Sequence, residues 1–198
     1  MTADESFADL FAPDPIAPAT ASPADPWKVL LVDDEPDVHA ALRLALQDAR
    51  IEGRPLRLLD ARSAAEARVR IAAEPDIALL LLDVVMESEH AGLDLVRHIR
   101  QVLGNHSVQI IILTGQPGYA PQRQVVTDYE IDGYRLKSEL SADKIFVAVY
   151  SALRTHRIVS ELDRKTVAVQ AALAEAQRFR HAMDRAPSCI YLKNRELR

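Results

Sequence analysis

Three aspartates stand where apolar runs of the sequence end. Asp33 and Asp34 follow the run 29–32, and Asp83 follows the run 78–82. A single aspartate at a strand end is most often a turn former or a helix cap. Three carboxylates gathered in one place would repel one another without a cation, and Mg²⁺ suits them because it prefers hard oxygen ligands and keeps waters that a phosphate can replace. The pattern therefore indicates a site for phosphoryl transfer.

Two further polar residues fit the same chemistry. A carboxylate such as that of Asp83 can attack phosphorus directly when nearby cations offset the charge on the transferring group. Lys137 is the cation we expect to do this, and the Thr114 hydroxyl can donate a hydrogen bond to a phosphoryl oxygen. Tyr134 is then expected to respond to the modification by moving inward. These four residues form the predicted set for reaction and switching.

From Trp27 onward, short apolar segments alternate with amphipathic ones, as expected when helices connect buried parallel strands. Strands are predicted at 28–32, 56–60, 77–82, 109–113 and 133–136. Helices are predicted at 38–50, 64–73, 93–103, 121–129 and from a start after Ser141. We therefore expect an α/β fold, with a doubly wound, flavodoxin-like sheet of five parallel strands and five helices. Ligands of such sheets lie beyond the carboxyl ends of the strands, where the polar residues above should meet.

Two tracts resemble parts of the receiver domains of two-component response regulators. The tract 29–35 (VLLVDDE) resembles that family's first strand with its acidic pair, and the tract 80–86 (LLLDVVM) resembles its phosphoacceptor strand. The likeness spans 27–154 and implies that Asp83 accepts a phosphoryl group. It also implies a partner, which is a sensor histidine kinase or a phosphotransfer protein, with small phosphodonors as substitutes.

The same resemblance assigns roles to further residues. It implies that Asp34 binds Mg²⁺ directly, that Asp33 does so partly through water, and that the backbone carbonyl of Val85 is another ligand. It also supplies a signalling hydroxyl, a phosphate-pairing lysine and a switch aromatic, which correspond in that order to Thr114, Lys137 and Tyr134. The resemblance therefore implies the same site as the residues themselves.

Two positions depart from the family pattern. Receivers usually carry proline where this chain has Glu87 and Ser138. Without a Lys-Pro turn, we expect Lys137 to be held by a local arrangement of Ser138 and Glu139. The loop 87–91 is one residue longer than usual and is expected to bring two extra acids near the phosphoacceptor. These departures keep open a second interpretation, a phosphate-independent pseudo-receiver that dimerises or docks partners.

A haloacid-dehalogenase-like phosphohydrolase is an alternative from another class. It would also use a strand-end aspartate and Mg²⁺, but that family carries Asp-x-Asp after its first strand. Here the adjacent pair Asp33 and Asp34 precedes a lone Asp83 in a later strand. The order of the motifs therefore disfavours this class.

No proline or glycine interrupts the sequence between Lys144 and Pro187, so the last helix can extend well beyond the receiver. A seven-residue apolar repeat over 155–185 favours a parallel dimeric coiled coil. The repeat consists of Val159, Leu162, Thr166, Val169, Leu173, Ala176 and Met183, with Arg180 interrupting it. The alternative is a single helix packed on its own domain. We favour the homodimer because polar flanks leave one narrow apolar seam.

The last residues, 186–198, resemble the start of a PAS sensor domain and then stop. One strand cannot complete a fold, so we expect the chain to be a fragment of a longer regulator. The tracts 115–118 and 137–140 look like those of regulators that continue into PAS and GGDEF modules. For the fragment we expect no enzymatic activity beyond its own phosphorylation and dephosphorylation. The output that the resemblance implies is a diguanylate cyclase.

The composition, 48% hydrophobic and 27% charged, is that of a globular protein, and no apolar run approaches the roughly 20 residues of a membrane helix. A net charge of -5 argues against nucleic-acid binding by this fragment. The leader 1–26 lacks the features of a secretion signal and is expected to be disordered. The single Cys189 fits a reducing compartment, so we expect a cytoplasmic protein without membrane partners. Four histidines are interpreted as surface or packing residues: His39, His90, His98 and His106.

Overall fold

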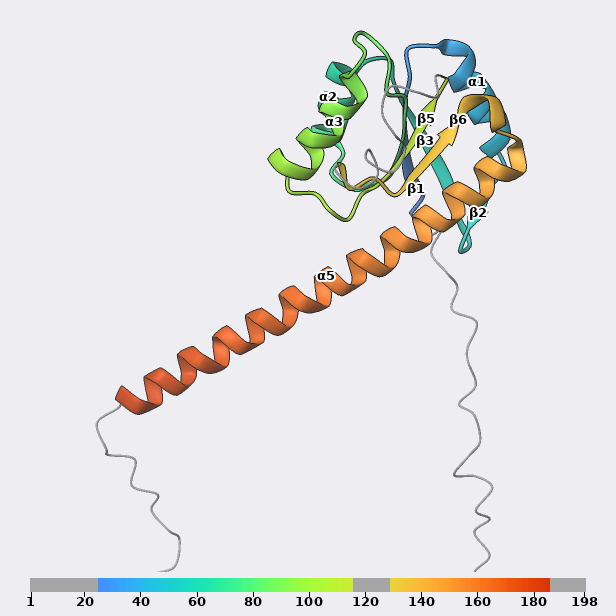
Figure 1. Cartoon of the computed structure of the whole chain (residues 1–198). Coiled ribbons are helices and arrows are strands. Elements are labelled where there is room, and N and C mark those ends of the chain that lie inside the picture. Colours follow the sequence, from blue (N-terminus) through green and yellow to red (C-terminus); the bar gives the residue numbers. More distant parts are fainter. Residues whose placement is uncertain (1–24, 116–128, 186–198) are drawn as a thin grey trace, which may run out of the picture.

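The computed structural model describes residues 25–115 and 129–185 (Figure 1). Within these ranges, six strands form one sheet in the order β2-β3-β1-β4-β5-β6. Their bounds are β1 Trp27–Val32, β2 Arg50–Ile51, β3 Arg54–Ala61, β4 Ile77–Leu82, β5 Gln109–Thr114 and β6 Gly133–Leu136. All neighbouring strands are parallel except β2 and β3. The doubly wound α/β class predicted from the sequence is confirmed, with one more strand than expected.

β2 is the additional strand, and it pairs antiparallel with the start of β3. The chain turns back through Glu52 and Gly53, whose φ angles of 52° and 78° lie in the left-handed region that two-residue hairpins use. The prediction that the first helix reaches residue 50 is wrong, because Arg50 pairs with Pro55 in this hairpin. A strand of two residues is too short to leave a periodic pattern in the sequence.

The long helices in the described ranges are α1 Pro36–Leu46, α2 Ala64–Ala73, α3 Ala91–Arg97 and α5 Ala142–Arg185. α3 continues through one π-helical turn, η2 His98–Val102, and a short 3₁₀ turn, η3 Lys137–Glu139, follows β6. The hydroxyl of Ser63 accepts the N–H of Glu66 at 3.1 Å and caps the start of α2. The helix predicted at 121–129 lies outside the described residues apart from Tyr129.

Alternate residues of the central strands pack against opposite faces of the sheet. Leu80 and Leu82 of β4 belong to the core under α2 and α3, whereas Leu79 and Leu81 belong to the core under α1 and α5. Helices therefore cover both faces of the sheet, as Figure 1 shows. β4 and β5 are buried along their whole length, which explains why they appear in the sequence as continuous apolar runs.

The strand order brings the predicted site residues to one edge of the sheet. β1 and β4 pair in register up to their last residues, so Asp33 and Asp83, which come next, follow neighbouring strands. β5 and β6 also pair up to their ends, which places Lys137 just beyond the strand next to Thr114. The carboxyl edge around β1 and β4, where the chain order reverses, is thus the place where these side chains meet.

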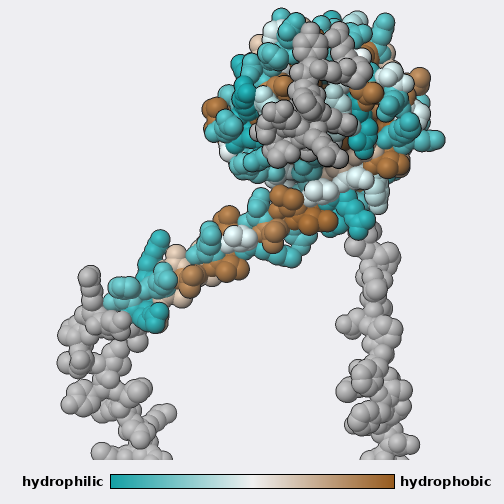
Figure 2. All heavy atoms as spheres, in the orientation of Figure 1, coloured by the Kyte–Doolittle hydropathy of each residue, from teal (hydrophilic) through white to brown (hydrophobic). Residues whose placement is uncertain are grey.

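α5 has two parts. Its first turns pack on the sheet through buried side chains that include Ile145, Val149 and Leu153. Beyond Glu161 the helix projects from the domain as a rod, with nearly every side chain exposed as far as His181 (Figures 1 and 2). The long C-terminal helix predicted from the sequence is therefore present.

Three predicted features lie wholly or largely outside the described residues. They are the leader 1–26, of which only the last two residues are described, the PAS-like tract 186–198, and Cys189 within that tract. Among the helices in the described ranges, none has the length and apolar character needed to cross a bilayer.

Candidate functional site

Four carboxylates gather at the carboxyl edge of the sheet. One oxygen from each of Asp33, Asp34, Glu35 and Asp83 lies within 4.8 Å of the others. Asp33 and Asp83 are 3% and 5% exposed, whereas Asp34 and Glu35 are open to solvent. The cavity beside them has a volume of about 420 Å³ and is lined by Asp34, Glu35 and Asp83, together with Thr114. The carboxylates predicted to share a site therefore do so, and Glu35 joins them.

The ammonium of Lys137 lies among these carboxylates. Its Nζ is 2.8 Å from Asp33 Oδ2, 2.7 Å from Asp83 Oδ2 and 2.9 Å from Glu35 Oε1. Burial alone would lower the pKa of this ammonium, but its hydrogen bonds to the three carboxylates outweigh burial and raise the pKa. Burial raises the pKa of the Asp83 carboxyl, against the opposing effect of Lys137. Lys137 is therefore a fixed positive charge within the site.

The donor atoms of this cluster suit a hard divalent cation. Four carboxylates face the single ammonium of Lys137, so the cluster keeps an excess of negative charge. Two of these carboxylates are buried, where uncompensated charge is costly. Carboxylate oxygens with room for water are the ligand set that Mg²⁺ favours. The residues of the site therefore fit Mg²⁺.

The loop after β4 holds the Asp83 carboxylate in place. Asp83 Oδ1 accepts the N–H of Val85 at 3.3 Å, and the carbonyl of Val84 accepts the N–H of Gly92 at 3.1 Å. A Cβ on Gly92 would lie only 2.2 Å from the carbonyl oxygen of Asp83. Only glycine allows the start of α3 to approach the loop this closely. Sequence analysis did not identify Gly92, because a glycine in a predicted loop is too common to stand out.

Glu87 has a different role from the one expected. Its Oε1 accepts the N–H of Ala64 at 2.9 Å, so its carboxylate caps the first turn of α2. The acid that joins the cluster next to Asp83 is instead Glu35. The Glu87 side chain therefore links the loop after β4 to α2.

The segment after β6 positions Lys137 without a proline. Residues Lys137–Glu139 form the turn η3, which the N–H of Leu140 closes by donating to the carbonyl of Lys137 at 3.3 Å. Ser138 therefore lies within a short helical turn. The turn begins directly at the edge of the sheet, so it presents the lysine to the carboxylates.

Thr114 and Tyr134 lie on adjacent strands at different distances from the cavity. Thr114 is 2% exposed and lines the cavity together with Asp83, Val85 and Lys137. Tyr134 is half-buried and packs against the core on the α2 and α3 side of the sheet. Burial raises the pKa of its hydroxyl. The structure thus places the predicted hydroxyl at the cavity, whereas Tyr134 pairs in register with Ile112, two residues before Thr114, and does not belong to the described residues that line the cavity.

A buried histidine lies behind the acidic pair. His39 is 7% exposed, with its Nε2 2.7 Å from the main-chain oxygen of Asp33 and its Nδ1 2.9 Å from Asp60 Oδ1. A carbonyl oxygen only accepts hydrogen bonds, so Nε2 donates to Asp33. Arg43 forms an ion pair with the other oxygen of Asp60. His39 therefore packs in the domain as expected, and in addition it fixes the main chain of a candidate metal ligand.

The chain matches the family described as Response regulator receiver domain over residues 29–150. It is also similar to 3'3'-cGAMP-specific phosphodiesterase 2 of Vibrio cholerae, with 50% identity over 133 residues. This match covers 67% of the present chain and 26% of that protein. The chain therefore spans about a quarter of the length of this relative.

Two solved structures illustrate the fold. The signal receiver domain of an HD domain-containing protein from Pseudomonas fluorescens has a TM-score of 0.56 and 23% identity, and the match covers 67% of this chain and 98% of that one. The N-terminal domain of a response regulator/sensory box/GGDEF 3-domain protein from Carboxydothermus hydrogenoformans has a TM-score of 0.54 and 17% identity, with coverages of 67% and 98%. At these identities the likeness establishes a common fold.

Proposed function

We propose that this chain, which belongs to the family of response regulator receiver domains, accepts a phosphoryl group on Asp83 and transmits the change through α5. The observation that carries the proposal is the position of Asp83. Its buried carboxylate contacts Lys137 at 2.7 Å and shares an acidic cluster that can hold a cation. A nucleophile, a fixed positive charge and metal-binding oxygens are the groups that aspartyl phosphorylation requires.

In the reaction, one oxygen of the Asp83 carboxylate attacks phosphorus. The bond from phosphorus to the donor's histidine nitrogen breaks as the new phosphorus–oxygen bond forms, and its electron pair stays on the imidazole, which takes up a proton from solvent and leaves as neutral histidine. Lys137 then pairs with the phosphoryl oxygens, and the Thr114 hydroxyl donates to one of them. The cavity of about 420 Å³ that these residues line leaves room for the group.

Asp33, Asp34, Asp83 and the backbone carbonyl of Val85 are the groups that would hold Mg²⁺. When bound, the metal would offset the charge of the carboxylates and of the transferring group. Two hydrogen bonds hold Asp33 in place. Its main chain accepts a hydrogen bond from His39, and its Oδ1 accepts the N–H of Glu35 at 3.0 Å.

The partner in this proposal is a sensor histidine kinase or a phosphotransfer protein, and a small phosphodonor can replace it in vitro. The test is intact mass after incubation with acetyl phosphate and Mg²⁺. We expect a gain of one phosphoryl group in the wild type, and none in Asp83→Asn or without metal. A label that persists in Asp83→Asn would contradict the assignment of the phosphoacceptor.

The second part of the proposal is a homodimer formed through the rod of α5. Leu162, Val169 and Leu173 are 63%, 67% and 58% exposed, and apolar side chains that recur along one face of an exposed helix are typical of a coiled-coil seam. At 3.6 residues per turn, this seam lies on nearly the opposite side of the helix from Val149 and Leu153, which face the receiver core. A second copy can therefore pack on the seam while α5 stays on its own sheet.

The third part concerns the output. The PAS-like tract at 186–198 and the tracts around Lys137 favour a PAS and GGDEF arrangement in the longer protein, with diguanylate cyclase activity. The relative named as a 3'3'-cGAMP-specific phosphodiesterase supports an enzyme that acts on cyclic dinucleotides, in the direction of hydrolysis. Assays of both synthesis and hydrolysis by the full gene product, with and without phosphodonor, distinguish these outputs.

One observation favours a second candidate function, that of a phosphate-independent docking or dimerisation module. Lys137 already pairs with Asp33, Glu35 and Asp83, so the site is internally neutralised in part without a phosphoryl group. This candidate predicts no mass gain with any donor and a dimer whose stability does not depend on acetyl phosphate. Sedimentation of the same samples used for mass analysis therefore separates the two functions.

A further inference from the structure

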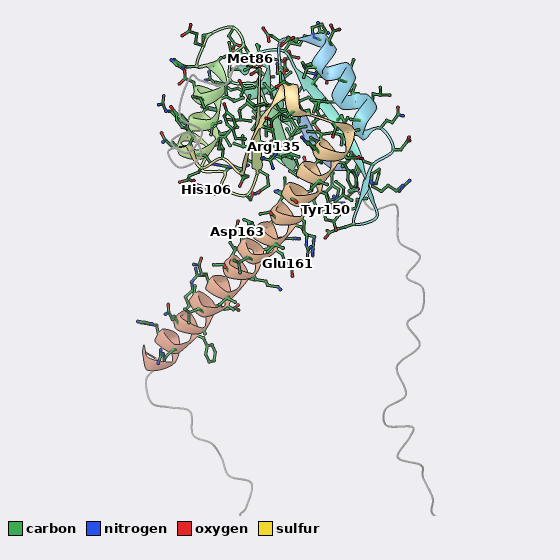
Figure 3. The ribbon with its side chains drawn as sticks, turned by 45° about the vertical axis from the view of Figure 1, so that its right-hand side comes forward. Met86, His106, Arg135, Tyr150, Glu161 and Asp163 are labelled. Carbon is green, nitrogen blue, oxygen red and sulfur yellow. The ribbon has the colours of Figure 1, made fainter. Side chains whose placement is uncertain are left out.

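A second cavity lies at the other end of the domain, where α5 leaves the receiver. Its volume is about 640 Å³, and it is bordered by the amino ends of β1 and β3 on one side and by α5 on the other. We call it the exit crevice. Met86 lines the phosphoacceptor cavity, and Glu161 lies on α5 next to the crevice residue Ser160. In Figure 3, Met86 and Glu161 lie at opposite ends of the domain.

The exit crevice is basic although the chain is acidic. Five cationic side chains line it, against the lining carboxylates of Asp25 and Asp76 and two further carboxylates, Glu52 and Glu74, that pair with lining cations. The whole chain, by contrast, has 24 Lys and Arg against 29 Asp and Glu. The five are Lys28, Arg54, Arg57, Arg157 and Arg164. Such a local reversal of charge favours an anionic ligand.

Three of the five cations already have acidic partners. Lys28 pairs with Glu74 and Asp76, and Arg57 also reaches Glu74. On the α5 side, Arg157 pairs with Glu52 of the β2–β3 hairpin at 2.7 Å. These pairs hold the walls of the crevice together.

The other two cations, Arg54 and Arg164, form no ion pair within the described part of the chain. The guanidinium of Arg54 lies 3.7 Å from the centroid of the Trp27 ring, and its Nε donates to the carbonyl of Asp25 at 2.6 Å. The Nε of Arg164 donates to the carbonyl of Ser160 at 3.2 Å. These contacts hold the two side chains without neutralising their charge, so each guanidinium keeps N–H groups that can bind an anion.

We infer that the exit crevice binds a small phosphate-bearing anion between Arg54 on the receiver and Arg164 on α5. Guanidinium groups bind phosphate oxygens through paired, charge-assisted hydrogen bonds, which makes phosphate the anion that matches this lining. Because one arginine belongs to the sheet end and the other to the helix, the bound anion connects the two walls. It thereby stabilises α5 in its present orientation, and this effect does not depend on phosphorylation of Asp83.

The test uses the only tryptophan of the chain, Trp27, which lines the crevice. Intrinsic fluorescence of the full chain is followed during titration with inorganic pyrophosphate in EDTA, with sodium chloride at matched ionic strength as the reference. Calorimetry of the same titration detects binding that leaves the fluorescence unchanged. We expect a saturable response to pyrophosphate, and a midpoint raised about tenfold or more in Arg164→Ala.

Two variants serve as controls. Arg178→Ala removes an exposed arginine of the same rod outside the crevice and should keep the wild-type midpoint. Asp83→Asn should also keep it, because the response comes from the opposite end of the domain. Arg164 lies on the exposed part of α5, so its replacement leaves the packing of the domain intact.

Three outcomes would overturn the inference. The first is the absence of both fluorescence change and heat beyond the chloride reference. The second is a midpoint in Arg164→Ala within about twofold of the wild type, a difference of about 0.4 kcal/mol in binding free energy. The third is co-sedimentation with vesicles of phosphatidylcholine and phosphatidic acid without any response to pyrophosphate, which would assign the crevice to a lipid headgroup.

Discussion

Nζ of Lys137 lies 2.7 Å from Oδ2 of Asp83, so the cation that would pair with a phosphoryl group rests on the carboxylate that would receive it. The contact is largely buried, with 15% and 6% of the two side chains exposed. Phosphorylation on Asp83 therefore requires the lysine to exchange a carboxylate oxygen for phosphoryl oxygens. Lys137 stays in an ion pair throughout this exchange, but its partner changes from a carboxylate to a larger phosphoryl group. The site would therefore have one arrangement with the phosphoryl group and another without it.

The raised pKa of Asp83 predicts how stability depends on pH. The folded state binds this proton more tightly than the unfolded chain, whose pKa is near the ordinary 3.8. The protonated carboxyl of Asp83 therefore contributes to the stability of the folded state. This contribution is complete below pH 3.8 and is lost as pH rises through the pKa of Asp83 in the folded state. We expect Asp83→Asn, in EDTA, to gain stability relative to the wild type as pH rises from 4 to 7. Urea unfolding at the two pH values measures this difference. If Asp83→Asn instead lost stability relative to the wild type over this range, burial would not raise the pKa of Asp83.

Gly92→Ala is predicted to disturb the loop after β4. The added Cβ would lie 2.2 Å from the carbonyl oxygen of Asp83, so the loop and the start of α3 must separate. We expect a loss of about 1–3 kcal/mol in the free energy of unfolding and slower labelling by acetyl phosphate. Gly115→Ala is the matched control at the same edge, since among the residues that the structure describes its Cβ would meet only Lys137, at 3.9 Å. Equal effects of the two substitutions would show that the close contact at Gly92 is unimportant.

His39→Ala is predicted to weaken Mg²⁺ binding more than it slows the reaction. The substitution removes the hydrogen bond to the main chain of Asp33, and groups that support metal ligands in this way typically contribute about 10–100-fold in affinity. Labelling by acetyl phosphate should need correspondingly more Mg²⁺ and reach a similar maximal rate. His106→Ala, which removes an exposed pair with Glu130, should behave as the wild type. A reduced maximal rate at unchanged Mg²⁺ dependence would refute this role of His39.

Leu173→Asp is predicted to abolish the homodimer. The leucine lies on the proposed seam, where a carboxylate from each copy would face the other in an apolar contact. Val167→Asp is the control, because Val167 is 65% exposed but lies about a third of a turn from the seam. Analytical ultracentrifugation should find a monomer for the first variant and a dimer for the second. A monomeric wild type would exclude the coiled coil.

Much of the fold and of the acidic site could be predicted from the sequence. Fully buried strands leave continuous apolar runs, and their order determines which strand ends meet, so Asp33 and Asp83 could be assigned to one site. Contacts that depend on three-dimensional approach could not be predicted in this way. The pairing of Glu87 with Ala64 and the hydrogen bond from His39 to Asp33 join segments whose spacing carries no pattern.

The most direct test of the central claim is chemical mapping of the phosphorylated residue. The chain is incubated with acetyl phosphate and Mg²⁺ and then reduced with borohydride, which converts an aspartyl phosphate to homoserine, and its peptides are analysed by mass spectrometry. We expect homoserine at Asp83 alone. Homoserine at Asp33 or Asp34, or an unmodified Asp83 in a folded protein with Mg²⁺ present, would contradict it.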